Sequence, residues 1–186
     1  YSLFQEITYF CSIEMSSFYL DIVKDRLYCE NKKSPERRSA QTVLTEVLRV
    51  LVRVISPVLS FTAEEIWERI PESIKEEESV HLSSWIEANP EYKNEGLAKK
   101  WEKIYHLRKE VNKKLEAERQ TGMIGHSLDA KVLLNISNDE YAFLKEYKEA
   151  EVSDLFIVSQ VKFVNDKLQE SEIEGITIAV EKASGE

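Results

Sequence analysis

The sequence has few of the residues from which metal, nucleotide and redox sites are built. Its 186 residues include two cysteines and three histidines, none of which has the spacing of zinc ligands. Five glycines leave no phosphate-cradling loop of the G-x-G-x-x-G or G-x-x-x-x-G-K type. No apolar run approaches the roughly 20 residues that span a bilayer, and the first residues lack the layout of a signal peptide. We therefore expect no metal ligand, no bound cofactor and no membrane segment in this chain.

Catalytic constellations are also missing. Carboxylates are abundant, but on the helical segments they alternate with lysines, which is typical of solvated faces rather than of a catalytic pair. His126, Ser127 and Asp129 are the residue types of a catalytic triad, yet neighbours so close in sequence cannot easily form one. Two cysteines in a chain of this length make a poor disulfide framework, so we expect a reducing compartment, the cytoplasm. We predict no catalytic residue.

The charge is unevenly distributed along the chain, although the net charge is −9. Residues 24–53 hold eight basic and four acidic side chains, and residues 96–119 again hold eight and four, so each stretch is at +4. Residues 64–91 hold two basic and nine acidic side chains, and residues 129–186 hold six and thirteen, so each is at −7. A locally positive face on an acidic protein is compatible with a polyanionic partner, and equally with ordinary solvated helices.

The first two predicted helices are marked by apolar spacing and by a capping signal. The chain begins at Tyr1 without a methionine and is helical in pattern almost at once, so we expect a piece of a longer protein. Residues 3–27 are apolar on two sides, which is typical of a helix inside a bundle. Ser34 is placed to cap a second helix that starts at Pro35 and ends near Pro57.

Two further helices are predicted in the first 120 residues. Thr62 and Glu65 fit a capping box for a short helix, with Phe61 and Ile66 placed as its hydrophobic staple. A long helix follows over residues 94–118. Its expected buried face consists of Leu97, Trp101, Ile104, Leu107, Val111 and Leu115.

The pattern then changes from the period of a helix to that of a strand. Residues 130–136 read as a strand, and residues 137–140 read as a capping box for a helix that runs to about residue 149. Residues 155–164 and 176–180 read as two more strands, with Gly175 in the turn before the last one.

Together these elements predict a mainly α protein. We expect a helical bundle over residues 1–120, followed by a small α+β domain over residues 121–186, with a break near Gly122 and Gly125. The sequence shows no internal repeat and no low-complexity tract.

Basic side chains on the helices and at their ends are the remaining candidates for function. Each could contact a phosphate and release condensed counterions, and arginine can also bind splayed bases. Tyr19, Tyr28 and Tyr105 are possible stacking partners for such bases. The candidate RNA-binding residues are Lys24, Arg26, Lys32, Lys33, Arg37, Arg38, Lys109, Lys113, Lys114 and Arg119.

Four segments resemble a known family. Residues 10–28 (FCSIEMSSFYLDIVKDRLY) and 37–44 (RRSAQTVL) resemble the first anticodon-domain helices of bacterial isoleucine–tRNA ligases. Residues 57–67 (PVLSFTAEEIW) resemble a segment that class I ligases for branched aliphatic amino acids share, so valine and leucine ligases remain alternatives on that segment. Residues 124–130 (IGHSLDA) resemble the entry to a C-terminal α/β junction, and this block and the first favour isoleucine.

The resemblance implies an anticodon-stem-binding helical bundle, a junction domain and a tRNA(Ile) partner, and we expect a monomer. Relatives continue into a cysteine-rich zinc knuckle where this chain ends, so ATP and zinc are implied for the full-length ligase and not for this piece. The class I signatures for nucleotide binding are absent, so the piece should not form an adenylate. A helical protein-interaction or scaffolding domain, for which the acidic segments would favour basic partners, is the alternative function.

Overall fold

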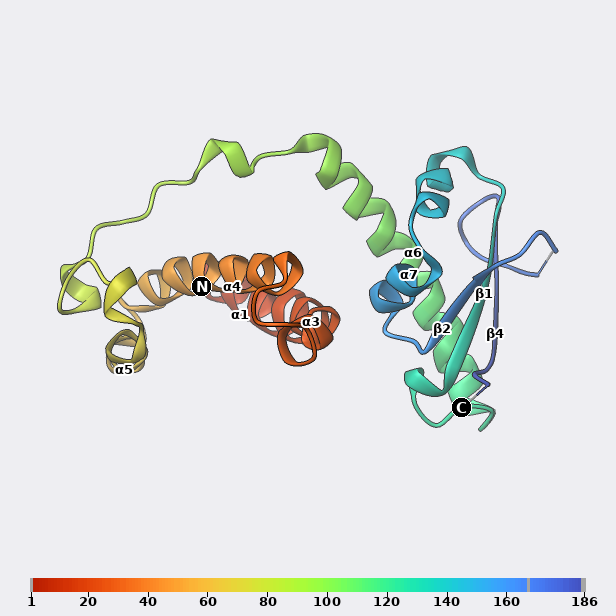
Figure 1. Ribbon diagram of the computed structural model, residues 1–186, viewed down its shortest axis with the longest axis horizontal. Coiled ribbons are helices and arrows are strands. Elements are labelled where there is room, and N and C mark those ends of the chain that lie inside the picture. Colours follow the sequence, from red (N-terminus) through yellow and green to blue (C-terminus); the bar gives the residue numbers. More distant parts are fainter. Residues whose placement is uncertain (1, 167, 185–186) are drawn as a thin grey trace. The chain divides into compact units, whose positions relative to one another are not determined.

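The computed structural model describes residues 2–166 and 168–184 (Figure 1). The chain divides into two compact units, an N-terminal unit (Tyr1–Lys93) and a C-terminal unit (Asn94–Glu186). The predicted fold class is confirmed, because helices dominate and a small sheet follows them. By its contacts, the long helix of residues 94–118 belongs to the unit that contains the sheet. The domain bounds of residues 1–120 and 121–186 stay a prediction.

The first predicted helix is one helical path with an unusual middle. It consists of α1 (Ser2–Tyr9), the π-helix η1 (Phe10–Tyr19), α2 (Leu20–Ile22) and α3 (Lys24–Tyr28). At the end of η1 the Leu20 N–H reaches the Met15 carbonyl, five residues back. Val23, at φ −95° and ψ 2°, breaks the path before α3. The expectation of two buried faces is wrong here: Phe18 and Val23 are buried, and the exposed side chains include Leu3, Phe4, Ile13 and Leu20.

Helix α4 (Pro35–Ile55) begins and ends as predicted. The Ser34 side chain accepts a hydrogen bond from the Arg37 N–H at 3.2 Å, and Pro35 occupies the first helical position. In the N-terminal unit, α3 lies beside the beginning of α4, and α5 (Ser60–Arg69) lies beside its end (Figure 1).

The start of α5 corrects the predicted capping box. The helix begins at Ser60, before Thr62, and its first backbone bond runs from the Ala63 N–H to the Leu59 carbonyl at 2.8 Å. Phe61, expected in a staple, is 93% exposed. The early start places Ala63 and Trp67 on the face that α4 covers, and both are buried.

The loop that follows α5, which we call the acidic loop, packs against the small core of the N-terminal unit. Val52, Ala63, Trp67, Ile70 and Val80 form this core, and the Trp67 Nε1–H donates to the Glu77 carbonyl at 3.0 Å. The loop carries three short 3₁₀ turns, η2 (Glu72–Ile74), η3 (Val80–Leu82) and η4 (Pro90–Tyr92).

Buried Arg53 ties the same loop to α4. Its guanidinium donates to the Ser84 carbonyl at 3.0 Å, pairs with Glu76 at 3.1 Å, and lies 4.9 Å from the centre of the Trp67 ring. Arg49 pairs with the same carboxylate at 2.6 Å. The acidic loop is thereby fixed at the C-terminal end of α4.

The C-terminal unit is built on α6 (Glu95–Gln120) and a four-stranded sheet. The strands are β1 (Ala130–Ile136), β2 (Gln160–Phe163), β3 (Gln169–Glu170) and β4 (Ile176–Lys182), in the order β2-β1-β4-β3. β1 pairs with β2 in parallel, and β4 is antiparallel to both β1 and β3.

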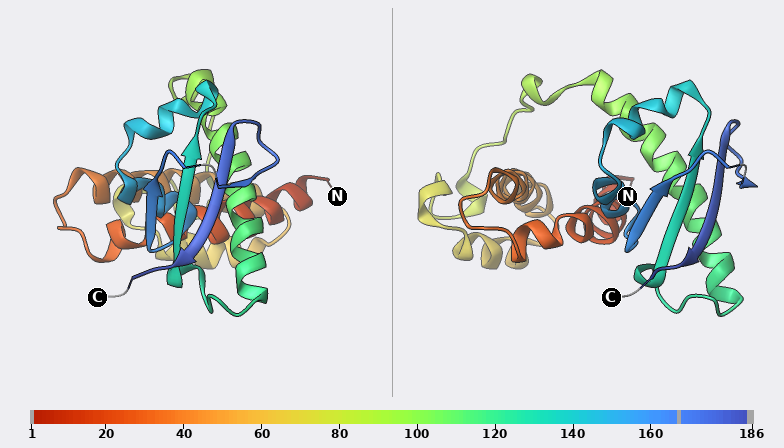
Figure 2. Two further views of the ribbon diagram at one scale, coloured as in Figure 1. Left: turned by 90° about the vertical axis from the view of Figure 1, so that its right-hand side faces the viewer. Right: turned by 45° about the vertical axis from the view of Figure 1, so that its right-hand side comes forward.

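One face of this sheet is covered by α6 and α7 (Glu149–Phe156), as Figure 2 shows. Alternate residues of β1 are buried on that face, as its period of two requires. The predicted apolar stripe of α6 is confirmed at Ile104, Leu107, Val111 and Leu115, which are buried against the sheet, whereas Leu97 is 49% exposed.

Several details between β1 and β4 differ from the predictions. Asn138, not Ser137, caps the following 3₁₀ helix η6 (Asp139–Glu146), because the Ser137 hydroxyl donates to the Gly175 carbonyl instead. Residues 155–156 end α7 and do not begin a strand, and β3 was not predicted. Gly175 lies in the turn before β4 at φ 75°, as predicted. No helix in the described part of the chain is long and apolar enough to cross a membrane.

Candidate nucleic-acid interface

Six of the ten predicted RNA-binding residues lie together in the N-terminal unit. They occupy α3, the loop that follows it, and the first turn of α4, and we call this set the basic corner. α3 and α4 pack against each other, so the two helices hold the loop between them. The basic corner consists of Lys24, Arg26, Lys32, Lys33, Arg37 and Arg38.

Backbone hydrogen bonds fix the loop of the basic corner. The N–H groups of Cys29 and Glu30 donate to the Asp25 carbonyl at 2.8 and 3.3 Å, which closes the end of α3. Asn31 then organises the turn: its carbonyl accepts from the Ser34 N–H and its side chain from the Lys33 N–H, both at 2.9 Å. Sequence reasoning missed this role of Asn31, although an Asn two residues before the bonded N–H is a recognisable turn signal.

The cations of the basic corner are accessible and have no acidic partner. Arg37 is half-buried and donates to the Glu30 carbonyl at 2.9 Å, while the other five are exposed. Within residues 2–166 and 168–184, none of the six forms an ion pair. Residues 24–38 contain these six cations and three acids, Asp25, Glu30 and Glu36, which leaves a local charge of +3.

The four remaining candidates lie on α6 in the C-terminal unit, and most of them have partners. Lys113 pairs with Glu110 at 2.8 Å and with Glu172 at 2.7 Å. These hydrogen bonds, from Glu110 first and then Glu172, raise the pKa of Lys113.

Arg119 pairs with Glu116 at 3.0 Å, and this bond lowers the pKa of the Glu116 carboxyl. Lys114 donates to the Gln169 side chain at 3.2 Å. Lys109 is exposed and forms no ion pair among the described residues. The structure therefore distinguishes six cations without carboxylate partners in one unit from a set of four in the other, of which Lys113 and Arg119 are paired with carboxylates.

Glu110 is one of the two carboxylates that pair with Lys113, and sequence reasoning missed this role of Glu110. Its side chain is 4% exposed and accepts from the Glu172 N–H at 3.0 Å as well as from Lys113. Burial raises the pKa of Glu110, but the hydrogen bonds from Lys113 and the Glu172 N–H outweigh it and hold the pKa below its ordinary value. Glu110 and Lys113 thus attach the turn between β3 and β4 to α6.

The three tyrosines considered as stacking partners differ in exposure. Tyr19 is half-buried, and burial raises its pKa although Arg26 acts in the opposite direction. Tyr105 is 45% exposed, and its ring lies 5.9 Å from the Trp101 ring between centroids. Tyr28 is 79% exposed at the end of α3, inside the basic corner.

His126, Ser127 and Asp129, which are the residue types of a catalytic triad, lie in a turn. The Asp129 carboxylate accepts the backbone N–H groups of His126 at 2.8 Å and Gly125 at 3.0 Å, and these bonds lower its pKa. The His126 ring nitrogen Nδ1 accepts from the Leu128 N–H at 3.2 Å. These contacts fix the chain ahead of β1. Within the described residues, no three His, Cys, Asp and Glu side chains are grouped as a metal site would require.

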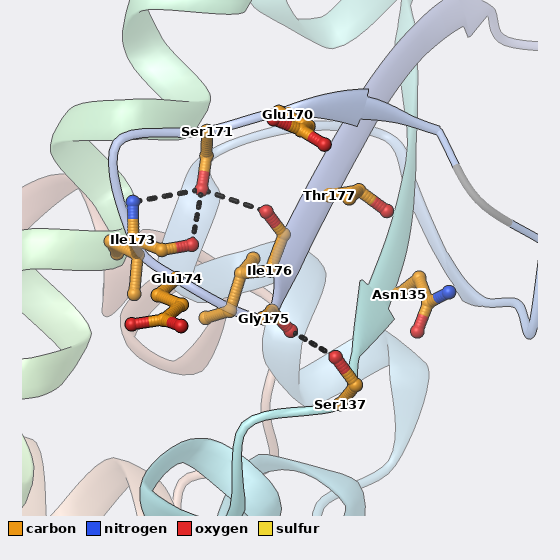
Figure 3. A pocket seen from close by; sticks show the side chains of 9 residues that line it. All are labelled: Asn135, Ser137, Glu170, Ser171, Ile173, Glu174, Gly175, Ile176 and Thr177. Atoms are coloured by element: carbon orange, nitrogen blue, oxygen red, sulfur yellow. Dashed lines mark hydrogen bonds between the residues drawn. The ribbon is translucent and has the colours of Figure 1, made fainter.

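A cleft of about 340 Å³ lies at the end of the sheet, between β1 and the turn before β4 (Figure 3). Its serines are bound to the backbone: the Ser171 hydroxyl donates to the Ile176 carbonyl at 2.9 Å, and Ser137 donates to the Gly175 carbonyl at 2.8 Å. Both hydroxyls thus bind the backbone of the turn before β4, which gives these serines a structural role.

Comparison with known proteins identifies the family. The model for the anticodon-binding domain of tRNA ligase matches residues 1–134. The chain is similar to isoleucine–tRNA ligases of Kosmotoga olearia (44% identity over 187 residues), Petrotoga mobilis (47% over 189) and Geobacter sulfurreducens (44% over 188). These alignments cover 99–100% of this chain but 20% of each relative, so the chain spans about a fifth of their length. Because the family model matches well over half of its residues, this chain belongs to the anticodon-binding domain family of tRNA ligases.

Proposed function

We propose that this chain is the tRNA-binding region of an isoleucine–tRNA ligase and that the basic corner contacts the anticodon stem-loop of tRNA(Ile). The observation that carries the proposal is the set of six cations without acidic partners in a member of an anticodon-binding family. Binding along the stem would position the acceptor end for ATP-dependent aminoacylation in the full ligase, which we place in the cytoplasm as a monomer.

The chemistry of the full ligase lies outside the residues described here. Those residues contain no group of ligands that fits a metal ion, and they contain no nucleotide-binding loop. We propose that zinc and ATP bind to other segments of the ligase.

The basic corner suits an RNA backbone for physical reasons. Each phosphate contact releases condensed counterions, so affinity falls with salt in proportion to the number of contacts. Unpaired cations can make these contacts without first leaving a carboxylate. Arg38 and Lys33 are the best reporters, because no hydrogen bond of their side chains occurs in the described structure. Arg37 also binds the Glu30 carbonyl, so its replacement would disturb the loop.

The test is a filter-binding titration of the 186-residue chain with tRNA(Ile) at several salt concentrations. We expect Lys33→Ala and Arg38→Ala to weaken binding and each to flatten the log–log salt slope by about one charge. Arg69→Ala is the control, because Arg69 is exposed at the far end of α5 and already pairs with Glu65 at 2.8 Å. Unchanged slopes for Lys33→Ala and Arg38→Ala would remove the basic corner from the interface.

The isoleucine assignment needs a second comparison. We expect protection mapping to show a footprint on the anticodon stem-loop of tRNA(Ile) that is weaker on tRNA(Val). Equal footprints would leave the family intact but contradict the choice of isoleucine. Lys109, Lys113, Lys114 and Arg119 stay predicted contacts; we expect smaller effects from Lys113 and Arg119, because RNA would have to replace their carboxylate partners.

A protein-interaction domain is the second candidate function. The observation that favours it is the number of exposed apolar side chains on the first helical path, where Leu3 is 63% exposed and Tyr9 55%. A pulldown in which protein partners bind and tRNA fails to compete would support this candidate over RNA binding.

A further inference from the structure

Tyr28 is a large aromatic side chain without a structural role in the N-terminal unit. It is the last residue of α3 and 79% of its surface is exposed. Among the described residues its hydroxyl has no hydrogen-bond partner, and no aromatic ring lies against its own. Neither packing nor hydrogen bonding within the unit accounts for it.

Charge distinguishes Tyr28 from the other exposed aromatic residues of the N-terminal unit. Tyr9 is flanked by Glu6 and Glu14, and Phe61 is followed by Glu64 and Glu65. Trp85 and Tyr92, 68% and 70% exposed, lie in or next to the acidic stretch of residues 64–91. Tyr28 also has two acids nearby, Asp25 and Glu30, but the six cations of the basic corner outnumber the three acids of residues 24–38, so its surroundings carry a net +3 in sequence. A polyanion would therefore be attracted to this ring more than to the others.

We propose that Tyr28 is a stacking surface for an unpaired base in the tRNA loop, an inference that rests on the proposed function. Protein recognition of RNA loops uses splayed bases stacked on aromatic rings, with nearby cations on the phosphates. The basic corner offers both parts: a ring directed to solvent and cations free to bind the backbone of the same nucleotides.

The setting of Tyr28 is rigid, which lowers the entropy lost on binding. Directly after it, the N–H groups of Cys29 and Glu30 are bound to the Asp25 carbonyl, and Arg37 holds the Glu30 carbonyl from α4. Both sides of the loop are therefore fixed before RNA arrives. Tyrosine itself has two side-chain torsions, so placing its ring against a base immobilises little.

The experiment compares Tyr28→Ala and Tyr28→Phe with the control Tyr92→Ala, which removes a similarly exposed tyrosine, at 70% against 79%, outside the basic corner. The probes are tRNA(Ile) and a blunt RNA duplex of its anticodon stem, which has no unpaired base. We expect Tyr28→Ala to weaken tRNA binding about 5- to 150-fold, the range measured for loss of one base–aromatic stack. The salt slope should not change, because no ion pair is lost, and Tyr28→Phe should bind within about twofold of the wild type.

The duplex distinguishes stacking from a general loss of structure. Tyr28→Ala should bind it as the wild type does, whereas an equal loss on duplex and tRNA would overturn the inference. If Tyr28→Ala binds tRNA as well as Tyr92→Ala does, the stacking role is wrong while the proposed function stands. If the wild type shows no salt-dependent binding of tRNA, the proposed function fails and the stacking role with it. A fluorescent base, 2-aminopurine, can also be placed in turn at each position of the tRNA loop. Its fluorescence should be quenched at one position by the wild type and by Tyr28→Phe, but not by Tyr28→Ala.

Discussion

The contact between Glu110 and the turn before β4 gives a quantitative test of the C-terminal unit. Glu110→Ala would remove the acceptor of the Glu172 N–H, a charge-assisted bond of 3.0 Å at a side chain that is 4% exposed. Such bonds contribute about 1.5–3 kcal/mol, so we expect the free energy of unfolding to fall by about 2 kcal/mol. We assign none of this loss to Lys113, because its side chain is 43% exposed and water screens it.

Thermal unfolding and amide exchange would measure this loss. For a unit of this size, about 2 kcal/mol lowers the melting temperature by about 10 °C. Protection of the Glu172 amide and of the β3–β4 turn should fall with it, because local opening needs less energy. Glu102→Ala is the control, since Glu102 is an exposed carboxylate on the same helix with no ion pair in the described structure.

The pH dependence follows from the lowered pKa of Glu110. A carboxyl whose pKa is depressed in the folded state adds stability above its ordinary pKa, near 4.5, and loses it as the pH falls through the folded value. The difference between wild type and Glu110→Gln should therefore be full at pH 7 and shrink below about pH 4.5. Two results would refute this account. One is an equal melting temperature for Glu110→Ala and Glu102→Ala at pH 7. The other is a stability difference between wild type and Glu110→Gln that stays the same in acid.

Two further predictions concern backbone geometry. Ser34→Ala should lower the free energy of unfolding of the N-terminal unit by about 1 kcal/mol, because the first turn of α4 loses its cap. Thermal unfolding followed by circular dichroism would measure this loss. Ser39→Ala, at an exposed position of the same helix, is the control and should leave the stability unchanged. Gly175→Ala should destabilise the C-terminal unit by at least about 1 kcal/mol, because φ is 75° and the new Cβ would lie 3.1 Å from the Asn138 Cβ. A urea titration of both glycine variants would check this: Gly96→Ala, whose nearest neighbour is at 3.5 Å in the first turn of α6, should be neutral or stabilising.

Local signals in the sequence predicted local structure well. The Ser34-Pro35 cap and the Gly175 turn depend on a few neighbouring residues, and both occur as predicted. The box at Thr62 failed although its pattern was complete. The helix starts three residues earlier, with Leu59 at the N-cap, and Ala63 and Trp67 of this helix are buried in the core that includes Val52 of α4. A capping pattern shows where a helix can begin, and tertiary packing decides where it does begin.

Periodicity predicted which residues of α6 are buried but not what covers them. Ile104, Leu107 and Val111 lie on the expected stripe, and their partners are strands that follow in sequence rather than the preceding helices. An apolar stripe carries no information on its partner. The π-helix η1 was missed for a related reason, since the same residues satisfy an i→i+4 or an i→i+5 ladder.

At the candidate interface, the sequence likewise gave the balance of charges but not the partners of each charged side chain. Counting gave residues 24–53 and 96–119 the same balance, yet the cations of the basic corner are unpaired while Lys113 has two carboxylate partners. The partner at Glu110 is three residues away and visible in sequence, but Glu172 is brought to α6 by the sheet. Only the coordinates could therefore rank the two sets.

An anionic chain and an RNA-binding corner are compatible because salt limits the range of charge. The basic corner lies at the N-terminal end of α4, and the acidic loop is fixed near its C-terminal end by Arg49 and Arg53. Arg49, which binds the acidic loop, follows Arg38 by eleven residues, or about 16 Å along the helix, which is about two Debye lengths at physiological ionic strength. A phosphate at the corner therefore responds more strongly to the local +3 than to the acidic loop. Lowering the salt lengthens that range, so the repulsion from the acidic loop should grow in the same titration that strengthens the corner's own contacts.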